Sequence, residues 1–449
     1  MHVDVEKLLS LAKRLGASEA EIYIVRSKSV SVEARRSELE QASMDEVTRI
    51  GVRTAIGKKV GAAGGVAASE SDAEKIIEEA IKIARTAPED PNWPGFNPNV
   101  GAAQYKLDVF DEPTASLSSE DLVELLLGQL KIVKAEENVV ASEAGVEAGI
   151  VEATYTNTGG GIVEGRRSFF SYGIELKKTG SEGEGTFYDY FTKARLEPDR
   201  VETTTLNALK MVSEAVKARP IETIRGDLVL TPDEASSIIA TLISPAISAE
   251  QAQKGRSPLK DRLGVQVLDK GISIIDDPFL PWEPGSATWD DEGHPTSRKA
   301  VFEDGVFKTF LYDYYAASRE GKSSTGNASR RMPWSTPTPA PANLVVKVKD
   351  RVRSIDDLLA EIETGILVVR TIGSWMSNPV NGQINATISF GFLVSKGSIE
   401  RPVKGLVLTD NIYEVLGPRF VNAGGEPECR GGVCTSALHS REVTFSGKG

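Results

Sequence analysis

Histidine and cysteine are scarce in this 449-residue chain, which has three histidines and two cysteines. Zinc sites in proteins are built mainly from these two residue types, so the shortage severely restricts any metal site. The low cysteine count also fits a reducing compartment, and we expect the protein in the cytoplasm. The residues concerned are His2, His294, His439, Cys429 and Cys434.

Long apolar runs and an excess of positive charge are absent as well. No uninterrupted apolar run reaches the roughly 18 residues of a membrane-spanning helix, and the first segment, MHVDVEKLLSLAKRLG, is typical of an amphipathic helix rather than a signal peptide. With 64 acidic and 52 basic residues the net charge is −12, so no domain-wide basic surface can neutralise phosphates. We therefore expect neither a membrane nor a nucleic acid as a partner.

The first half of the chain alternates helical and strand patterns. Apolar spacings of three and four predict helices near residues 5–15, 71–84, 119–135 and 199–217, and Ser71 with Glu74 predicts a capping box for the second. Period-two alternation predicts strands near 30–35, 48–53, 60–66, 139–157, 162–177 and 184–195. Residues 1–218 are thus predicted to form an α+β domain with an antiparallel sheet.

The second half is dominated by short strands. A strand at 227–230 precedes Thr231, Pro232 and Glu234, which together predict a capped helix reaching about residue 252. One more helix is predicted near residues 354–363. Residues 226–449 should form a β-rich, barrel-like domain, which gives a two-domain α+β protein.

The segment 290–327 has the densest group of polar and aromatic residues. The Asp304-Gly305 step between apolar pairs predicts a tight hairpin turn. Just before it, Asp290, Asp291 and His294 lie in a predicted loop that is either a solvated acidic turn or a binding site. Adjacent aspartates on a strand point to opposite faces, so a shared acid–base role for this pair would require a bend. The tyrosines that follow, at positions 312, 314 and 315, are expected to pack a strand onto the core.

The two cysteines allow three interpretations of their chemical state. Cys429 and Cys434 flank Arg-Gly-Gly-Val, and a two-residue Gly-Gly turn would place the two sulfurs opposite each other, as a disulfide or as free thiols. Alternatively, Cys429, Cys434 and His439, with His294, could form a metal site, although their spacing differs from that of usual zinc sites. No Gly-x-Ser-x-Gly motif accompanies any serine.

Five segments together carry a family resemblance: GDLVLTPDEAS (226–236), DDEGHPTSRKAVFEDGVFKTFLYDYYAA (290–317), KSSTGNASR (322–330), PANLVV (341–346) and NPVNGQINATISFGFLVSKGSIERPVKGLVLTDN (378–411). They resemble the TldD/PmbA family, long described as modulators of DNA gyrase. The resemblance covers the second half of the chain and implies a two-domain fold and dimers that enclose a cavity. It further implies that a TldD-type subunit is a zinc peptidase for short or unfolded peptides, whereas the PmbA (TldE) type lacks the metal site.

The helix after strand 227–230 distinguishes the two types. TldD-type subunits have His-Glu-x-x-x-His there and a cysteine near the C-terminus; this chain has no histidine in that helix. The resemblance therefore indicates the PmbA (TldE) type, with no metal of its own and zinc only in the partner. Cys429 lies near the place of the family's ligand cysteine and is interpreted as a remnant.

Three functional hypotheses follow. The first is a PmbA/TldE-like subunit that binds extended peptide beside a TldD-type protease, with Asp290, Asp291, His294 and Cys429 as substrate-binding candidates and no assigned catalytic residue. The second is a stand-alone homodimer that binds peptides. The third is an enzyme that uses the Asp290–His294 loop or the Cys429, Cys434 and His439 group.

Overall fold

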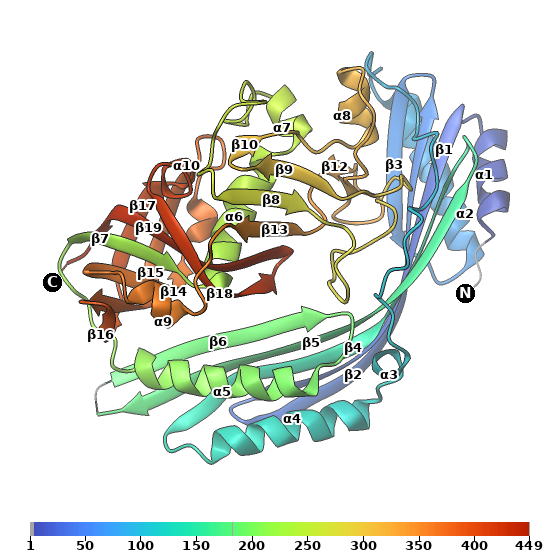
Figure 1. Ribbon diagram of the computed structural model, residues 1–449. Helices are drawn as coiled ribbons and strands as arrows, with labels where there is room; N and C mark the ends of the chain where they lie inside the picture. Colours follow the sequence, from blue (N-terminus) through green and yellow to red (C-terminus); the bar gives the residue numbers. More distant parts are fainter. Residues whose placement is uncertain (1–3, 182, 449) are drawn as a thin grey trace.

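The N-terminal part folds as a six-stranded antiparallel sheet that curves into a half-barrel (Figure 1). The computed structural model describes residues 4–181 and 183–448. Side chains alternate between the two faces of each long strand, as the period-two pattern predicts. In the order β3-β2-β1-β4-β5-β6 the strands are Lys59–Val66, Glu38–Ile56, Glu19–Arg35, Val139–Asn157, Ile162–Gly180 and Gly183–Lys193.

Helices cover one face of this sheet. α1 (Val5–Arg14) and α2 (Glu70–Thr86) pack against β1 to β3, whereas α4 (Ser119–Lys134) and α5 (Pro198–Ala215) lie along β4 to β6, with the short α3 (Glu112–Ala115) beside them. α1 stops before Gly16, whose φ of 101° confirms the predicted left-handed residue after the helix. The capping box of α2 begins two residues earlier than predicted. Ser69 and Asp72 form it instead of Ser71 and Glu74, because the Asp72 side chain accepts a hydrogen bond from the Ser69 amide.

The C-terminal part contains a closed five-stranded barrel, which confirms the predicted barrel-like architecture. β7 (Ile224–Leu230) pairs in parallel with β14 (Thr364–Ile372), and antiparallel pairs then link β15 (Gln383–Ser395), β17 (Leu406–Asn411) and β19 (Val433–Ser446). β19 pairs with β7 and closes the ring. The predicted two-domain α+β class thus describes the molecule.

Further strands extend the barrel sheet into a wing that reaches toward the half-barrel (Figure 1). β13 (Leu344–Val348) pairs with β19 and leads to β8 (Ile272–Asp276), β9 (Lys299–Glu303) and β10 (Val306–Phe307). The β9–β10 turn is the predicted hairpin, with Asp304 and Gly305 both at positive φ. The remaining strands are β16 (Ser398–Val403), β18 (Phe420–Arg430), β11 (Ala328–Ser329) and β12 (Thr338–Pro339).

Six short or medium helices complete the C-terminal part among the described residues. They are α6 (Pro232–Ala246), α7 (Ala249–Gln253), α8 (Tyr314–Arg319), α9 (Ile355–Leu359), the 3-10 helix η1 (Ser374–Met376) and α10 (Ile412–Val415), with α6 against the barrel. The helix predicted to reach residue 252 divides at Ile247, and the one predicted for 354–363 is shorter.

Two local predictions in this half were wrong. Thr231 makes no side-chain capping bond, and Glu234 instead accepts hydrogen bonds from the amide and hydroxyl of Thr371, so no capping box forms. Tyr314 and Tyr315 belong to α8 rather than a strand, because the Asp313 side chain caps that helix through the Ala316 amide. Tyr312 is buried as expected, but outside a strand.

The two parts share a hydrophobic core. One cluster of buried side chains joins the half-barrel and its helices α4 and α5 to residues of the barrel, and Phe187 of β6 packs edge to face on Phe390 of β15 at 6.1 Å. The barrel residues in this cluster include Val229, Leu367, Val369, Phe392 and Ala437. The described helices are too short or too polar to cross a lipid bilayer.

Candidate functional site

The loop at Asp290 lies where the C-terminal wing meets the half-barrel. Asp290 is buried, and its Oδ1 accepts hydrogen bonds from the amides of Glu292 (3.0 Å) and His294 (2.9 Å), while Oδ2 accepts from the Ala328 amide (2.9 Å). Burial, and then the neighbouring Glu292, raises the pKa of Asp290 well above its usual range. Asp290 therefore orders the loop.

Asp291 points toward the half-barrel. Its Oδ1 accepts a hydrogen bond from the Tyr23 hydroxyl at 2.8 Å, and its Oδ2 accepts one from the Arg330 amide at 2.7 Å. The two adjacent carboxylates lie in a turn rather than a strand, and they have separate sets of donors. A shared acid–base role for the pair gains no support from this arrangement.

His294 is half-buried and faces its own loop. Its Nδ1 lies 2.9 Å from the Pro295 carbonyl oxygen, and burial lowers the pKa of the imidazole. Cys429 lies elsewhere, at the tip of the β18–β19 hairpin beside α6 and β6. The four substrate-binding candidates thus fall into two groups, with Asp290, Asp291 and His294 at one place and Cys429 at another.

A buried group of charges, which the sequence did not reveal, lies next to Asp291. We call Glu21, Arg53, Tyr155 and Arg330 the Glu21 network. The Glu21 carboxylate accepts hydrogen bonds from Arg53 Nε at 2.5 Å, from Arg330 Nη2, and from the Tyr155 hydroxyl at 2.8 Å. Burial alone would raise the pKa of Glu21, but Arg330 and Arg53 lower it to about 2. The network is charged and joins β1, β2 and β4 to the segment that follows β11 in the C-terminal part.

Further carboxylates extend from this network. Glu292 Oε1 lies 3.7 Å from Arg53 Nη2, and its Oε2 accepts from the Tyr314 amide at 2.8 Å. Asp313, the residue that caps α8, is also buried. Burial, and then the charge of Glu292, raises the pKa of Asp313 to about 7.

A cavity of about 640 Å³ opens between the half-barrel and the wing, next to Asp291. Its volume is within the range of small-molecule and cofactor pockets. Polar, charged and aromatic side chains from both parts line it, among them Tyr23, Arg166, Arg167, Trp289, Asp291 and Asn327.

A second hollow of about 720 Å³ lies on the sheet face of β1, β4, β5 and β6, and we call it the trough. Small residues line it at Ser31, Gly145, Ser171 and Gly173. Five glutamates and one arginine also line it, namely Glu33, Glu40, Glu143, Glu147, Glu175 and Arg35. The trough is therefore acidic, and the stacked rings of Tyr188 and Tyr190 lie at its β6 side.

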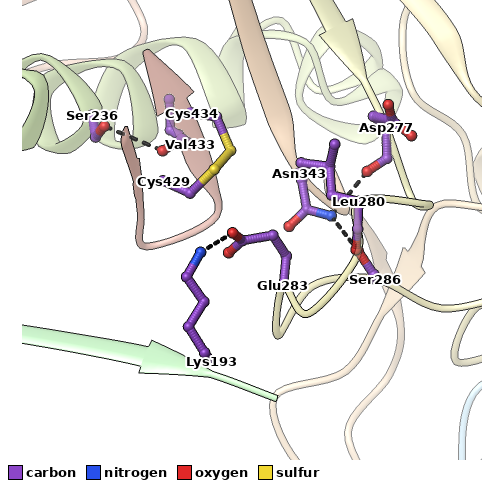
Figure 2. Close-up of a disulfide and its surroundings, with 10 residues drawn as sticks. All are labelled: Lys193, Ser236, Asp277, Leu280, Glu283, Ser286, Asn343, Cys429, Val433 and Cys434. Atoms are coloured by element: carbon purple, nitrogen blue, oxygen red, sulfur yellow. Dashed lines mark hydrogen bonds and ion pairs between the residues drawn. A yellow bond between two sulfur atoms is a disulfide. The ribbon is translucent and has the colours of Figure 1, made fainter. Parts of the chain in front are cut away.

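A second junction joins β6 to the barrel, and we call it the Arg430 bridge (Arg430, Asp189, Asp233 and Arg370). Arg430 Nη2 lies 3.2 Å from Asp189 Oδ1 of β6, and its Nε lies 4.0 Å from Asp233 Oδ1 of α6. Arg370 pairs with Asp233 and donates to the Tyr188 carbonyl oxygen at 2.9 Å. Arg430 follows Cys429, which is bonded to Cys434 in a disulfide (Figure 2).

The chain offers a poor donor set for a metal ion. Ser236 of α6 donates to the Val433 carbonyl oxygen, and Glu234 is held by Thr371. His439 is buried with its Nε2 2.9 Å from Asp227 Oδ2, and His2 lies outside the described residues. Across residues 4–181 and 183–448, no group of three or more His, Cys, Asp or Glu side chains is arranged to hold a metal ion.

The alternative metal site of Cys429, Cys434, His439 and His294 is not assembled. Both sulfurs are in the disulfide, and the His439 ring pairs with Asp227. Cys434 and His439 are five residues apart on β19, so their side chains leave opposite faces of the strand.

Comparisons with known proteins agree with this fold. The model of the PmbA/TldA metallopeptidase C-terminal domain matches residues 223–447, and that of PmbA/TldA metallopeptidase domain 1 matches residues 20–84. An uncharacterized protein of Methanocaldococcus jannaschii is 30% identical over 92% of this chain and 93% of its own length. A metalloprotease PmbA homolog of Haemophilus influenzae is 26% identical over 98% and 94%.

The fold is also that of a solved relative. The crystal structure of TldE from Thermococcus kodakarensis matches with a TM-score of 0.91 at 24% identity, and the match covers 99% of this chain and 100% of the other. The family model spans half of the chain, and the first of the relatives above matches over nearly its full length. The chain therefore belongs to the PmbA/TldD family.

Proposed function

We propose that this chain is the PmbA/TldE-type subunit of a two-subunit peptidase, and that it binds extended or unfolded peptide without a zinc site of its own. The observation that supports this proposal most directly is the sequence of α6, which contains no histidine. The helix in which TldD-type subunits place two histidines has none here, and its Glu234 and Ser236 make structural hydrogen bonds. Zinc would belong to the TldD-type partner, and the pair would act in the cytoplasm.

The shape of the half-barrel supports peptide binding. Gly145 leaves open space above the sheet within the trough, so a main chain can approach closely there, and the carboxylates that line the trough can hold a cationic side chain. Residues 38–47 of β2 pair with β1 on one side, whereas β3 pairs only with Arg49–Ile56 on the other. This open edge offers backbone hydrogen bonds to an added strand, a mode that is indifferent to peptide sequence.

Coupled purification with the TldD-type relative from the same genome tests the proposal. We expect a stable complex by light scattering, hydrolysis of an unfolded peptide by the complex, and loss of hydrolysis with a chelator. This chain alone should hold less than about one tenth of a zinc ion per chain and should hydrolyse nothing, because it has no activated water or nucleophile.

Two results would contradict the proposal. Chelator-resistant hydrolysis by this chain alone would indicate an enzyme with its own site, for which the Asp290–His294 loop is the remaining candidate. A homodimer that binds peptide but ignores the TldD-type relative would instead support a stand-alone binding protein.

A further inference from the structure

The two cysteines of the chain form a cross-strand disulfide at the tip of the β18–β19 hairpin (Figure 2). Cys429 and Cys434 are direct partners in the register, and Arg430 and Val433 are the next pair. Gly431 and Gly432 then close the turn at φ of 55° and 80°, a conformation that glycine adopts at low cost. The disulfide thus closes a loop of four residues.

This small loop contacts three separate segments. Arg430 pairs with Asp189 of β6 and approaches Asp233 of α6. The Gly432 carbonyl oxygen accepts a hydrogen bond from the Leu344 amide of β13 at 2.8 Å. The Val433 carbonyl oxygen accepts one from the Ser236 hydroxyl at 3.2 Å. The position of the tip therefore sets the contacts of β6, α6 and β13 at once.

The two sulfurs differ in access. Cys434 is 4% exposed, whereas Cys429 is only partly buried and follows three exposed residues, 426–428. Thiol–disulfide exchange requires a thiolate to reach one sulfur of the pair. A reductant from solution would therefore attack at Cys429.

We propose that the Cys429–Cys434 pair is a redox modification site, reduced by small dithiols, and that its reduction releases the hairpin tip from β6, α6 and β13. A dithiol thiolate attacks Cys429 Sγ, the sulfur–sulfur bond breaks, and Cys434 leaves as a thiolate that takes up a proton. The second thiol of the reductant then attacks the mixed disulfide and frees Cys429. The protein gains two electrons and two protons, and the dithiol becomes a cyclic disulfide.

The size of the loop favours a local role over a stabilising one. A disulfide restricts the unfolded chain less when the closed loop is short, so this bond adds less to global stability than a long-range bridge would. Disulfides of proteins in reducing compartments are moreover usually transient or redox-sensing. The role does not depend on the proposed peptidase partnership.

Hydrogen exchange of the full-length wild-type protein, oxidised and then reduced with dithiothreitol, tests this. Mass tagging should count no free thiols before reduction and two after it, because the chain has two cysteines. Amides in the peptides covering 428–434 and 340–348 should then exchange at least about fivefold faster, and those of β4 should not change. The Cys429→Ser, Cys434→Ser double variant should exchange like the reduced protein with and without dithiothreitol.

Two results would overturn the proposal. One is a count of two free thiols after treatment with oxidised glutathione, which would mean that the bond does not form. The other is reduction that leaves exchange in 340–348 and 428–434 unchanged. The wild-type measurement decides the matter even where the double variant fails to fold.

Single cysteine variants test which sulfur the reductant attacks. The remaining thiol should be alkylated faster in Cys434→Ser, which leaves Cys429, than in Cys429→Ser, which leaves the buried Cys434. Equal rates would overturn attack at Cys429.

Discussion

The two junctions between the half-barrel and the barrel differ in how deeply their charges are buried. In the Glu21 network the side chains of Glu21, Arg53 and Arg330 are 2%, 5% and 1% exposed. In the Arg430 bridge, Arg430 and Asp189 are 10% and 3% exposed, but the Arg370–Asp233 pair is 22% and 21% exposed. Removing one partner from a buried set leaves an unpaired charge without water, whereas a pair that reaches solvent, such as Arg370 and Asp233, is partly rehydrated. The first junction, whose charges are all buried, should therefore contribute more to stability than the second, where only one of the two pairs is out of reach of water.

The largest effect is expected from Glu21→Gln, which removes the anion shared by two buried guanidinium groups and leaves Arg53 only the more distant Glu292. We expect a loss of about 3 kcal/mol in the free energy of unfolding, measured by urea denaturation at pH 7. Glu33→Gln is the matched control, because Glu33 is an exposed glutamate on the same strand and should stay within about 0.5 kcal/mol of wild type. Equal losses in the two variants would show that burial does not distinguish these positions.

The first junction should also respond to pH. Burial and then Glu292 raise the pKa of Asp313 to about 7 from the ordinary 3.8, so its contribution to stability is full below about pH 4 and is lost as the pH rises through 7. The pKa of Glu21 is lowered from 4.5 to about 2, so its contribution to stability is full above pH 4.5 and is lost as the pH falls through 2. Between about pH 4 and pH 7, stability should thus fall with rising pH through Asp313.

The Asp313→Asn variant isolates that dependence. Asparagine keeps the helix cap but does not titrate, so the slope between pH 4 and pH 7 should flatten by up to about 1.4 kcal/mol per pH unit. Urea denaturation at several pH values measures the slope. An unchanged slope would mean that Asp313 does not titrate in this range.

A smaller effect is expected at the second junction. Arg430→Gln should cost about 2 kcal/mol in the oxidised protein, because the buried Asp189 loses a charged partner but keeps the Asn207 amide, and Arg370 still holds Asp233. In the reduced protein the same change should cost less than half as much, since the released tip no longer places Arg430 against Asp189. A double-mutant cycle with Cys429→Ser measures this coupling, and additive effects would argue against it.

The smallest effect concerns the trough, where charge affects binding more than folding. Glu147→Gln should weaken the binding of a lysine-rich unfolded peptide about twofold, corresponding to about 0.5 kcal/mol. Fluorescence anisotropy at low salt measures it, with Glu137→Gln, an exposed change outside the trough, as the control. The same loss for an acidic peptide would contradict charge complementarity.

Sequence patterns predicted the sheets better than the contacts between them. Alternation along β4 and β5 and the Asp304-Gly305 turn depend on neighbours in sequence, and these predictions were confirmed. Glu21 lies on a strand among alternating polar residues, where its sequence neighbours are typical of an outward-facing position. Its partner Arg330 is 309 residues away, so no local signal marks the pair. Glu234 was misjudged for the same kind of reason, because its hydrogen-bond donor is Thr371, which is distant in the sequence.

The shared hydrophobic core has a consequence for how the chain can be divided. A cut in the connection near residue 220 would expose Phe187 on one fragment and Phe390 on the other, together with much of the cluster around them. Each fragment would show contiguous apolar surface of the kind that drives aggregation. The two halves should accordingly unfold in a single transition, and they should yield a native molecule from two separate polypeptides only when both are made together.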